Sequence, residues 1–169
     1  MTTEDLTPET PPAVSPGPPK FALEKLSPEQ VNIMWPAFQS AIKASLPPTE
    51  VTDDPAAMNN VLAAVMKGEL QVWIATKRGE DSCYVYGGAV TQITGPSVTG
   101  VKNLWLYSLF IHELPPAPLV GVIVEALREY ARANACKRMF GASNNEVILK
   151  LVVKHLGGNA DYRLIEMEV

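Results

Sequence analysis

The segment HELPPAPLVGVIVEALREYARANACKR, residues 112–138, carries the strongest indication of the fold of this chain. It begins at a strand end, crosses a proline-rich loop and continues as a helix. One face of that helix holds Val120, Ile123, Val124, Leu127, Ala131 and Asn134, and the charged residues lie on or near the opposite face. A helix N-terminus offers backbone N–H groups to an anion, but proline has none to offer. The segment therefore predicts a long, one-sided surface helix with few donors at its start.

Composition limits the architecture and the kinds of partner. With 169 residues, 47% of them hydrophobic, the chain can bury one good core, and we expect a single domain. The net charge is −4 and the basic residues are scattered, so we expect neither a nucleic-acid partner nor an anionic membrane. No secretion signal or membrane-spanning run is recognised, which favours a cytoplasmic protein. Cys83 and Cys136 have no metal-type spacing, and we expect reduced, packed thiols and no metal site.

The first 20 residues, MTTEDLTPETPPAVSPGPPK, differ from the rest of the chain. Six of the fifteen prolines fall here, and large apolar side chains are almost absent. Such a segment cannot bury enough surface to offset the entropy of ordering it. It is either an unstructured leader or an extended polyproline II arm that docks onto a protein partner. We expect residues 1–20 to form this arm and residues 21–169 to form the domain.

Two helices are expected after a short strand at residues 21–26. Ser27, Pro28 and Gln30 form a capping-box pattern for the first helix, although Pro36 must bend or split it. Asp54 is expected to cap a second helix that begins at Pro55 and ends at Gly68. The buried faces are predicted to hold Val31, Met34, Trp35, Phe38 and Ile42 in the first helix, and Met58, Val61, Leu62, Val65 and Met66 in the second.

Three strand-like runs follow, at residues 70–76, 83–93 and 103–111, with hairpin-like connections that predict an antiparallel meander. After the long helix come a strand at residues 136–142, a helix at 143–158 and a closing strand at 162–169. This order predicts an α+β fold, similar to an α/β sandwich, in which about four helices flank a mixed, mostly antiparallel sheet. Trp35, Trp73 and Trp105 are interpreted as core residues.

The element order and two phrases, VEALREYARANACKRM (residues 124–139) and SNNEVILKLVVKHLGG (143–158), resemble the GNAT (Gcn5-related N-acetyltransferase) superfamily. The resemblance spans residues 21–169. Residues 46–76, together with YSLFIHE at 107–113, also resemble small GNAT-fold proteins encoded by tailed bacteriophages. The resemblance implies the GNAT-like sheet and helices described above, and it directs attention to the loop before the long helix.

Active members of the superfamily cradle the acetyl-CoA pyrophosphate with a Gln/Arg-x-x-Gly-x-Gly/Ala loop. Aligning the long helices puts Pro115, Pro118 and Val120 at the three key positions, and a shift of one residue puts Pro116, Leu119 and Gly121 there. The cofactor loop therefore looks degenerate. If the site is active, the resemblance implies cofactor contacts from Phe110, Ile111, Leu119, Val120, Gly121 and Asn145.

Many members also use a tyrosine of the last helix as general acid, but the matching region here has Val152 and Val153. His155, on the apolar face of that helix, is interpreted as a packed core residue. In an active enzyme, Glu113 and His112 would be the acid/base candidates, because this strand end faces the substrate cleft in the fold. The alternative, which we favour, is that both residues simply belong to a solvated strand end.

Two hypotheses follow. The first is a GNAT-fold protein without acetyltransferase activity and without a cofactor, which acts as a structural or interaction component of a tailed-phage virion or of its assembly. It would contact phage structural proteins through residues 1–20 and occur in the host cytoplasm and the virion. The alternative is an acetyl-CoA-dependent N-acetyltransferase with an atypical pyrophosphate loop.

Overall fold

A computed structural model describes residues 20–47, 50, 54–79, 82–95, 98–143 and 146–156. The elements are β1 (Lys20–Lys25), α1 (Pro28–Ala44), α2 (Ala57–Met66), β2 (Leu70–Arg78), β3 (Cys83–Thr94), β4 (Asn103–Ile111), α3 (Ala117–Ala133), β5 (Arg138–Gly141) and α4 (Glu146–Leu156). The strands form one sheet in the order β1-β2-β3-β4-β5. Strands β1 to β4 pair antiparallel with one another in turn, and β5 runs parallel to β4. The predicted α+β class and the meander are confirmed, whereas residues 1–19 and the closing strand at 162–169 lie outside the described residues.

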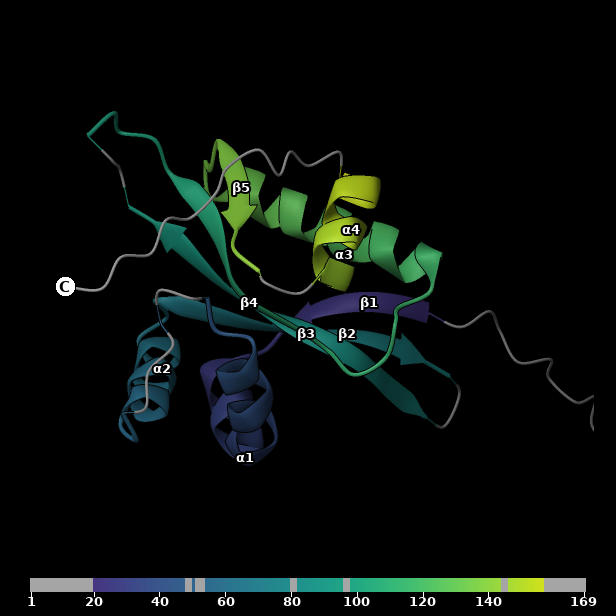
Figure 1. The fold of residues 1–169 in the computed structure, drawn as a ribbon, viewed down its shortest axis with the longest axis horizontal. Coiled ribbons are helices and arrows are strands. Elements are labelled where there is room, and N and C mark those ends of the chain that lie inside the picture. Colours follow the sequence, from purple (N-terminus) through teal and green to yellow (C-terminus); the bar gives the residue numbers. More distant parts are fainter. Residues whose placement is uncertain are drawn as a thin grey trace, which may run out of the picture.

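The helices form a layer on each face of the sheet. Figure 1 shows α1 and α2 below the sheet, and α3 and α4 above it. The buried residues accordingly form two clusters. One joins α1 and α2 to side chains such as Val72, Val90 and Phe110, and the other joins Leu127 of α3 to Trp73 and Leu106. Within the described ranges, no helix has the length and apolar character needed to cross a membrane.

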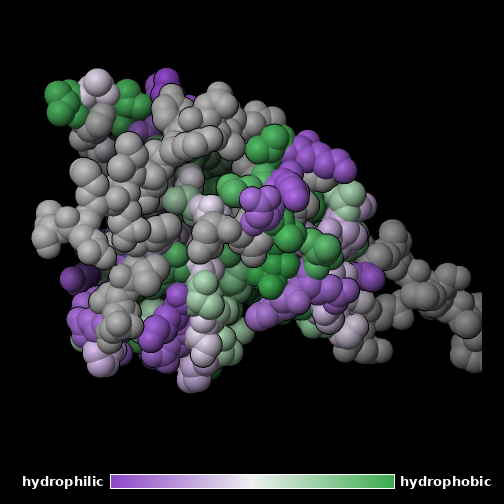
Figure 2. Space-filling view, viewed as in Figure 1, coloured by the Kyte–Doolittle hydropathy of each residue, from purple (hydrophilic) through white to green (hydrophobic). Residues whose placement is uncertain are grey.

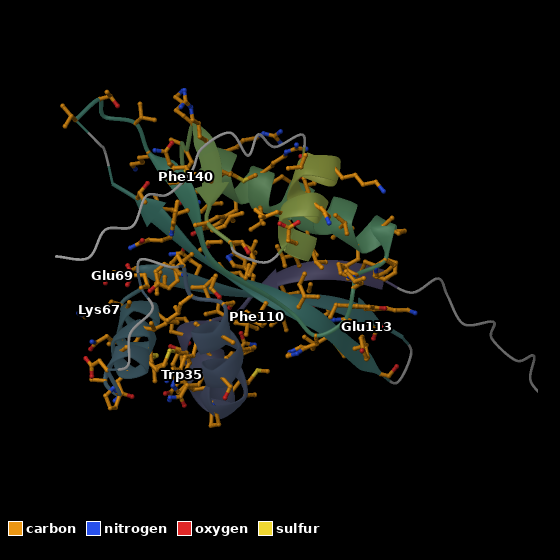
Figure 3. All side chains as sticks on the ribbon, viewed as in Figure 1. Trp35, Lys67, Glu69, Phe110, Glu113 and Phe140 are labelled. Atoms are coloured by element: carbon orange, nitrogen blue, oxygen red, sulfur yellow. The ribbon has the colours of Figure 1, made fainter. Side chains whose placement is uncertain are left out.

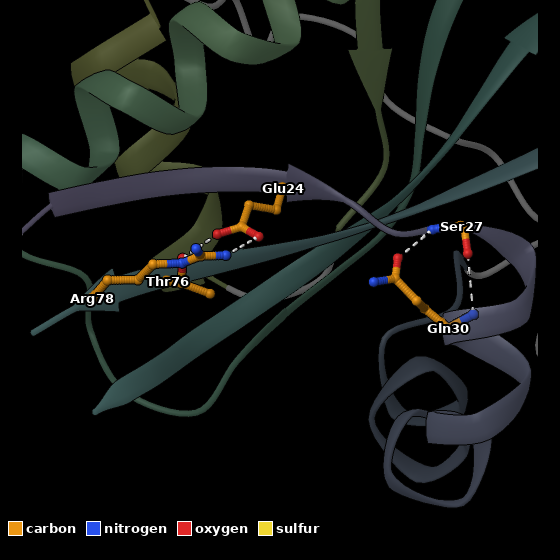
Figure 4. Close-up of polar contacts among 5 residues, drawn as sticks. All are labelled: Glu24, Ser27, Gln30, Thr76 and Arg78. Carbon is orange, nitrogen blue, oxygen red and sulfur yellow. Dashed lines mark hydrogen bonds and ion pairs between the residues drawn. The ribbon is translucent and has the colours of Figure 1, made fainter. Parts of the chain in front are cut away.

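The capping box predicted for α1 is present. The Gln30 backbone N–H donates to Ser27 Oγ at 3.2 Å, and the Ser27 N–H donates to Gln30 Oε1 at 2.8 Å (Figure 4). Pro36 lies inside the helix without splitting it. Figure 4 also shows an ion pair between Glu24 of β1 and Arg78 of β2. The Arg78 Nη2 and Glu24 Oε2 atoms are 2.6 Å apart, so this pair links the edge strand to its neighbour.

Several predicted details of α1 and α2 are wrong. The Asp54 carboxylate accepts the Ala56 N–H at 2.8 Å, but α2 begins only at Ala57 and has no side-chain cap. Asp54 thus forms a local turn ahead of the helix, because its side chain reaches the backbone two residues on. Met34 and Met66 are 38% and 46% exposed, since each lies at the margin of its helix's apolar face. Gly68 follows α2 with φ of +75°, as expected for a helix stop.

Other core assignments are also corrected. Trp35 and Trp73 are buried as predicted, but Trp105 is half-buried and packs edge-on against Phe140, with ring centroids 4.8 Å apart. Both cysteines are free thiols, as expected. Cys83, however, is exposed at the first position of β3.

Two neighbouring strands each contain one extra residue. Ala75 and Thr76 pair with Gly87 and Val85, which leaves Tyr86 as a bulge in β3. Val90 and Thr91 pair with Ser108 and Leu106, which leaves Tyr107 as a bulge in β4. Because of the second bulge, Tyr107 and Ser108 both face α1 and α2: Tyr107 packs on that cluster, and Ser108 bonds to Ser45 at the end of α1.

The long helix α3 ends in a Schellman motif. The Cys136 N–H donates to the Ala131 carbonyl at 2.9 Å, and the Ala135 N–H donates to the Arg132 carbonyl at 3.0 Å. Ala135 occupies the position after the C-cap with φ of +57°, where glycine is the usual residue. The last turn of α3 therefore contains a small local strain, because a Cβ disfavours this left-handed conformation.

Candidate functional site

The sheet opens between β4 and β5. Strand β5 pairs only with Asn103–Leu106, the first four residues of β4. In the part of the chain that the structure describes, residues 107–111 have no strand partner on the β5 side. The β4–α3 loop and the start of α3 follow this free half-strand directly. The candidate site is therefore the second half of β4, the loop at residues 112–116 and the N-terminus of α3.

The N-terminus of α3 offers few amide donors. Its N-cap is Pro116, in extended conformation, and Pro118 occupies the second helical position. Of the four N–H groups that a helix normally leaves free, at residues 116–119 here, two are absent. The Leu119 N–H is directed to the Pro116 carbonyl at 2.9 Å, as is the Val120 N–H at 3.2 Å. Ala117 is the one position in this first turn whose N–H has no backbone acceptor among the described residues.

Three of the predicted cofactor residues line one apolar cavity between α3 and the sheet, with a volume of about 110 Å³: Phe110, Ile111 and Val120. The Phe110 side chain is only 6% exposed and points toward α1, where its ring centroid lies 6.2 Å from that of Phe38 (Figure 3). A Cβ at Gly88 would lie 2.5 Å from the Phe110 ring, so glycine is needed for this close approach.

The other predicted cofactor residues do not share that cavity. Leu119 is fully buried in the core, and Gly121 is exposed on α3 with open space around it. Asn145 lies outside the described residues. On the face drawn in Figure 2, hydrophobic side chains gather where the β4–α3 loop and the start of α3 meet the sheet. Leu114 of this loop is 61% exposed.

The two predicted acid/base residues have different surroundings. The Glu113 carboxylate accepts a hydrogen bond from the Tyr84 hydroxyl at 2.5 Å, and this bond is the main reason why the pKa of Tyr84 is raised. The His112 ring lies 6.2 Å from the Phe110 ring. The backbone N–H groups of His112 and Glu113 both donate to the Tyr86 carbonyl, at 2.8 and 3.4 Å. The start of the loop is thereby fixed to the bulge of β3.

Tyr84 and Tyr86 are site residues that sequence reasoning missed. Their rings are 4.8 Å apart and meet edge to face. Together with Glu113, Lys77, Gly79 and Ser82 they line a second hollow of about 340 Å³, of mixed polar and apolar character, at the end of the β2–β3 hairpin. The pair of tyrosines in CYVYGG was the available signal, but only the fold places the pair beside Glu113.

A third polar group lies on the opposite face, at the β4 bulge. Ser45 Oγ and Ser108 Oγ are 2.5 Å apart, and Ser108 is only 2% exposed. Burial, and secondarily the Glu50 carboxylate that the phenol hydrogen-bonds, raises the pKa of Tyr107 to about 12. Tyr107 is therefore a neutral hydrogen-bond donor at physiological pH, because its proton leaves only in strong alkali.

The remaining sequence-based candidates can be placed only in part. Val153 of α4 is 46% exposed, whereas the side chains of Val152 and His155 are outside the described residues. Among the residues that the structure describes, no cluster of three or more His, Cys, Asp or Glu side chains could hold a metal ion.

Comparison with known proteins gives a clear answer for the fold alone. No protein-family model and no curated protein matches the sequence. Among solved structures, the aminoglycoside N-acetyltransferase AAC(6')-Iy in complex with CoA is similar with a TM-score of 0.63 at 15% identity, over 92% of this chain and 99% of that one. A predicted acetyltransferase with acetyl-CoA from Clostridium acetobutylicum has a TM-score of 0.61 at 11% identity, over 88% and 96% of the two chains.

A third similar structure is the ribosomal-protein-alanine N-acetyltransferase from Brucella melitensis biovar Abortus 2308. It has a TM-score of 0.60 at 11% identity, over 89% of this chain and 100% of that one. The chain therefore has the GNAT fold, as its sequence resemblance implied. At these identities the similarity concerns the architecture, and function must be argued from the site.

Proposed function

We propose that this chain is a GNAT-fold protein without acetyl-CoA-dependent acetyltransferase activity, which serves as a structural or interaction module. The observation that carries the proposal is the start of α3, where Pro116 and Pro118 remove two of the four N–H groups that could receive a pyrophosphate. A third N–H, that of Leu119, is directed toward the Pro116 carbonyl. This helix terminus is poorly suited to an anion despite its favourable dipole.

The expected loss of affinity is large. A hydrogen bond to a charged group contributes about 1.5–3 kcal/mol, so the two missing donors correspond to about 3–6 kcal/mol. At tenfold per 1.4 kcal/mol, this weakens binding by on the order of 10²–10⁴. The packed core is unaffected, since both clusters are built from apolar side chains that need no ligand. A fold can persist in this way after its original site is gone.

The proposed partner is a protein. The proline-rich residues 1–20 are the segment best suited to contact it, because an extended proline-rich chain loses little entropy on docking. The resemblance of residues 46–76 and 107–113 to proteins of tailed phages supports a role in a virion or in its assembly. Such a protein would be made in the host cytoplasm and be carried in the particle.

A second candidate function is an acetyl-CoA-dependent N-acetyltransferase with an atypical pyrophosphate loop. Two observations favour it: the sheet still opens between β4 and β5, and Glu113 lies at the end of the free half-strand with a hydrogen-bonded tyrosine beside it. Two of the similar structures contain CoA or acetyl-CoA. In this case Glu113 or His112 would take the proton from the amine, directly or through a water molecule.

Thermal unfolding and calorimetry with millimolar acetyl-CoA separate the two functions. A site with micromolar affinity would be stabilised by about 4 kcal/mol at a thousandfold excess, which a melting curve detects readily. We expect no shift and no heat of binding for the natural chain. The double variant Pro116→Gly/Pro118→Ala restores two N–H groups and should gain measurable binding.

The matched control is Pro28→Ala, which changes a proline at the start of α1, far from the loop. It should bind no acetyl-CoA, like the natural chain. Val120 is left unchanged, because its side chain lies on the buried face of α3 and its truncation would damage the core. Micromolar binding by the natural chain, with turnover lost in Glu113→Gln, would replace the proposed function by the second candidate.

A further inference from the structure

Aromatic side chains form a row at one end of the sheet. Phe21 of β1 pairs with Lys77 of β2, and Lys77 pairs with Tyr84 of β3. Residues that lie directly opposite each other in an antiparallel pair project to the same face of the sheet. This is the face that α3 covers, because Leu23, two residues after Phe21, packs in the cluster that contains Leu127. The row therefore lies on the α3 side of the sheet.

The tyrosines of this row are open to solvent and fixed in place. Tyr84 is 46% exposed, and its ring meets that of Tyr86 edge to face at 4.8 Å. The Tyr84 hydroxyl is held by the Glu113 carboxylate, which fixes the ring. At the end of β4 and in the following loop, Ile111 and Leu114 are exposed as well. Aromatic rings bordered by exposed apolar side chains form the kind of surface that recognises proline-rich chains.

The same surface offers hydrogen-bond donors. Lys77 and Tyr86 both line the second hollow. Among the described residues, the Lys77 ammonium group and the Tyr86 hydroxyl make no hydrogen bond or ion pair. A proline-rich segment has few N–H groups, and its carbonyl oxygens have no internal partners. Such a segment therefore needs donors from the surface that it binds, and this hollow supplies them.

The chain that precedes β1 is attached at this end of the sheet. Lys20, the first residue of β1, pairs with Arg78, the last residue of β2. Figure 1 shows the start of β1 on the same side of the sheet as the end of β2 and the start of β3. Because neighbouring strands are about 4.8 Å apart, Phe21 and Tyr84 are separated by about 10 Å across the sheet. Residues 1–19 are thus tethered close to the two tyrosines.

Residues 11–16, PPAVSP, match this surface in length and chemistry. Pro-Gly and Gly-Pro pairs mark turns, so Gly17, which stands between two prolines, allows the chain to reverse just before β1. At about 3.1 Å per residue, an extended segment of six residues spans about 19 Å, which is enough to cross both tyrosines. Val14 supplies an apolar side chain for the mouth of the cavity beneath α3, which Tyr86 also lines.

We propose that residues 11–16 dock in polyproline II conformation on the Tyr84–Tyr86 surface of their own chain, with Val14 at the mouth of the apolar cavity. This contact rests on the proposed function of the arm and adds that, in the free chain, the arm is held on its own domain until a protein partner displaces it. A short tether gives an effective concentration in the millimolar range, so a contact of millimolar affinity is about half formed. Its loss changes the melting temperature little, because a half-formed contact adds little to the free energy of unfolding.

Amide chemical shifts of the full chain, without partner or acetyl-CoA, test the docking. Val14 has an N–H group, and the difference between its shift in the full chain and in a synthetic peptide of residues 1–19 measures the docked fraction. We expect nuclear Overhauser contacts between the Tyr84 ring and the prolines of residues 11–16. Tyr84→Ser removes the ring and should reduce the docked fraction about threefold, whereas Tyr84→Phe keeps the ring and should keep the docking.

Each side of the contact has a matched control. Phe140→Ser removes an aromatic side chain of similar exposure, 41%, from β5 and should leave the docking unchanged. In the arm, the double variant Pro11→Ser/Pro12→Ser should release the segment, and Pro8→Ser, which lies outside the segment, should not. A thermal melt of each variant checks its fold.

Three results would overturn the assignment. The first is a Val14 shift equal to that of the free peptide, and the second is the same docked fraction in Tyr84→Ser as in Phe140→Ser. The third is a docked fraction that falls on dilution from about 500 to about 20 μM, because a contact within one chain does not depend on concentration and the arm would then bind a second copy. The acetyl-CoA and incorporation experiments use separate readouts, so the proposed function can hold or fail independently of this contact.

Discussion

Replacement of Ala135 by glycine should stabilise the domain. Ala135 sits after the C-cap of α3 with φ of +57°, and both hydrogen bonds of the Schellman motif hold it there. The left-handed conformation costs an L-residue with a Cβ about 1–2 kcal/mol, whereas glycine loses about 0.5–1 kcal/mol more backbone entropy on folding. The difference predicts a gain of about 0.5–1 kcal/mol in the free energy of unfolding. Urea denaturation measures it as a higher midpoint at an unchanged m-value.

Ala133→Gly is the matched control, because Ala133 is exposed like Ala135 but is the last residue of α3. The same chemical change should there lower the free energy of unfolding by up to about 1 kcal/mol, the helix-interior penalty of glycine. The sign of the effect thus depends on the backbone conformation alone. If Ala135→Gly destabilises the domain as much as Ala133→Gly does, the assignment of a strained left-handed residue is refuted.

Two further predictions concern the core and the N-terminal segment. Leu127→Ala should cost about 2–5 kcal/mol in urea melts, because Leu127 is 3% exposed and its loss enlarges a cavity that already lies beneath α3. Leu114→Ala, at a position 61% exposed, should change stability by less than about 0.5 kcal/mol, and equal losses would show that the burial is misassigned. Deletion of residues 1–19 should leave the melting temperature of the domain nearly unchanged and abolish incorporation into the proposed assembly, and normal incorporation would eliminate the docking role.

Local sequence signals predicted most of the secondary structure. The capping box at Ser27, the glycine stop at Gly68 and the alternation in residues 103–111 each act over a few residues, so their structural effect can be read from the chain. Asp54 shows the limit of this reasoning. A helix cap and a turn residue look alike in sequence, and the difference between them depends on where the next hydrogen bonds form.

The site was predictable only where one segment supplies it. The prolines before α3 and the position of Glu113 follow from the sequence of a single loop. The contact of Glu113 with Tyr84 depends on the pairing of β3 with β4, and the contact of Ser108 with Ser45 depends on a bulge. Neither has a signature that the alternation of apolar and polar residues could reveal, because a bulge interrupts that alternation.

The bulge at Tyr107 also changes the expected effect of a single-residue deletion in this sheet. In a regular strand, loss of one residue turns every later side chain to the wrong face. In β4, loss of Tyr107 would instead remove the unpaired residue and leave Leu106 and Ser108 opposite their present partners. An in-frame deletion of this codon would therefore spare the ladder and remove only the phenol that reaches Glu50. Tyr107 is thus the residue of β4 that the pairing with β3 does not require. We therefore expect its role to depend on the contacts of its hydroxyl group.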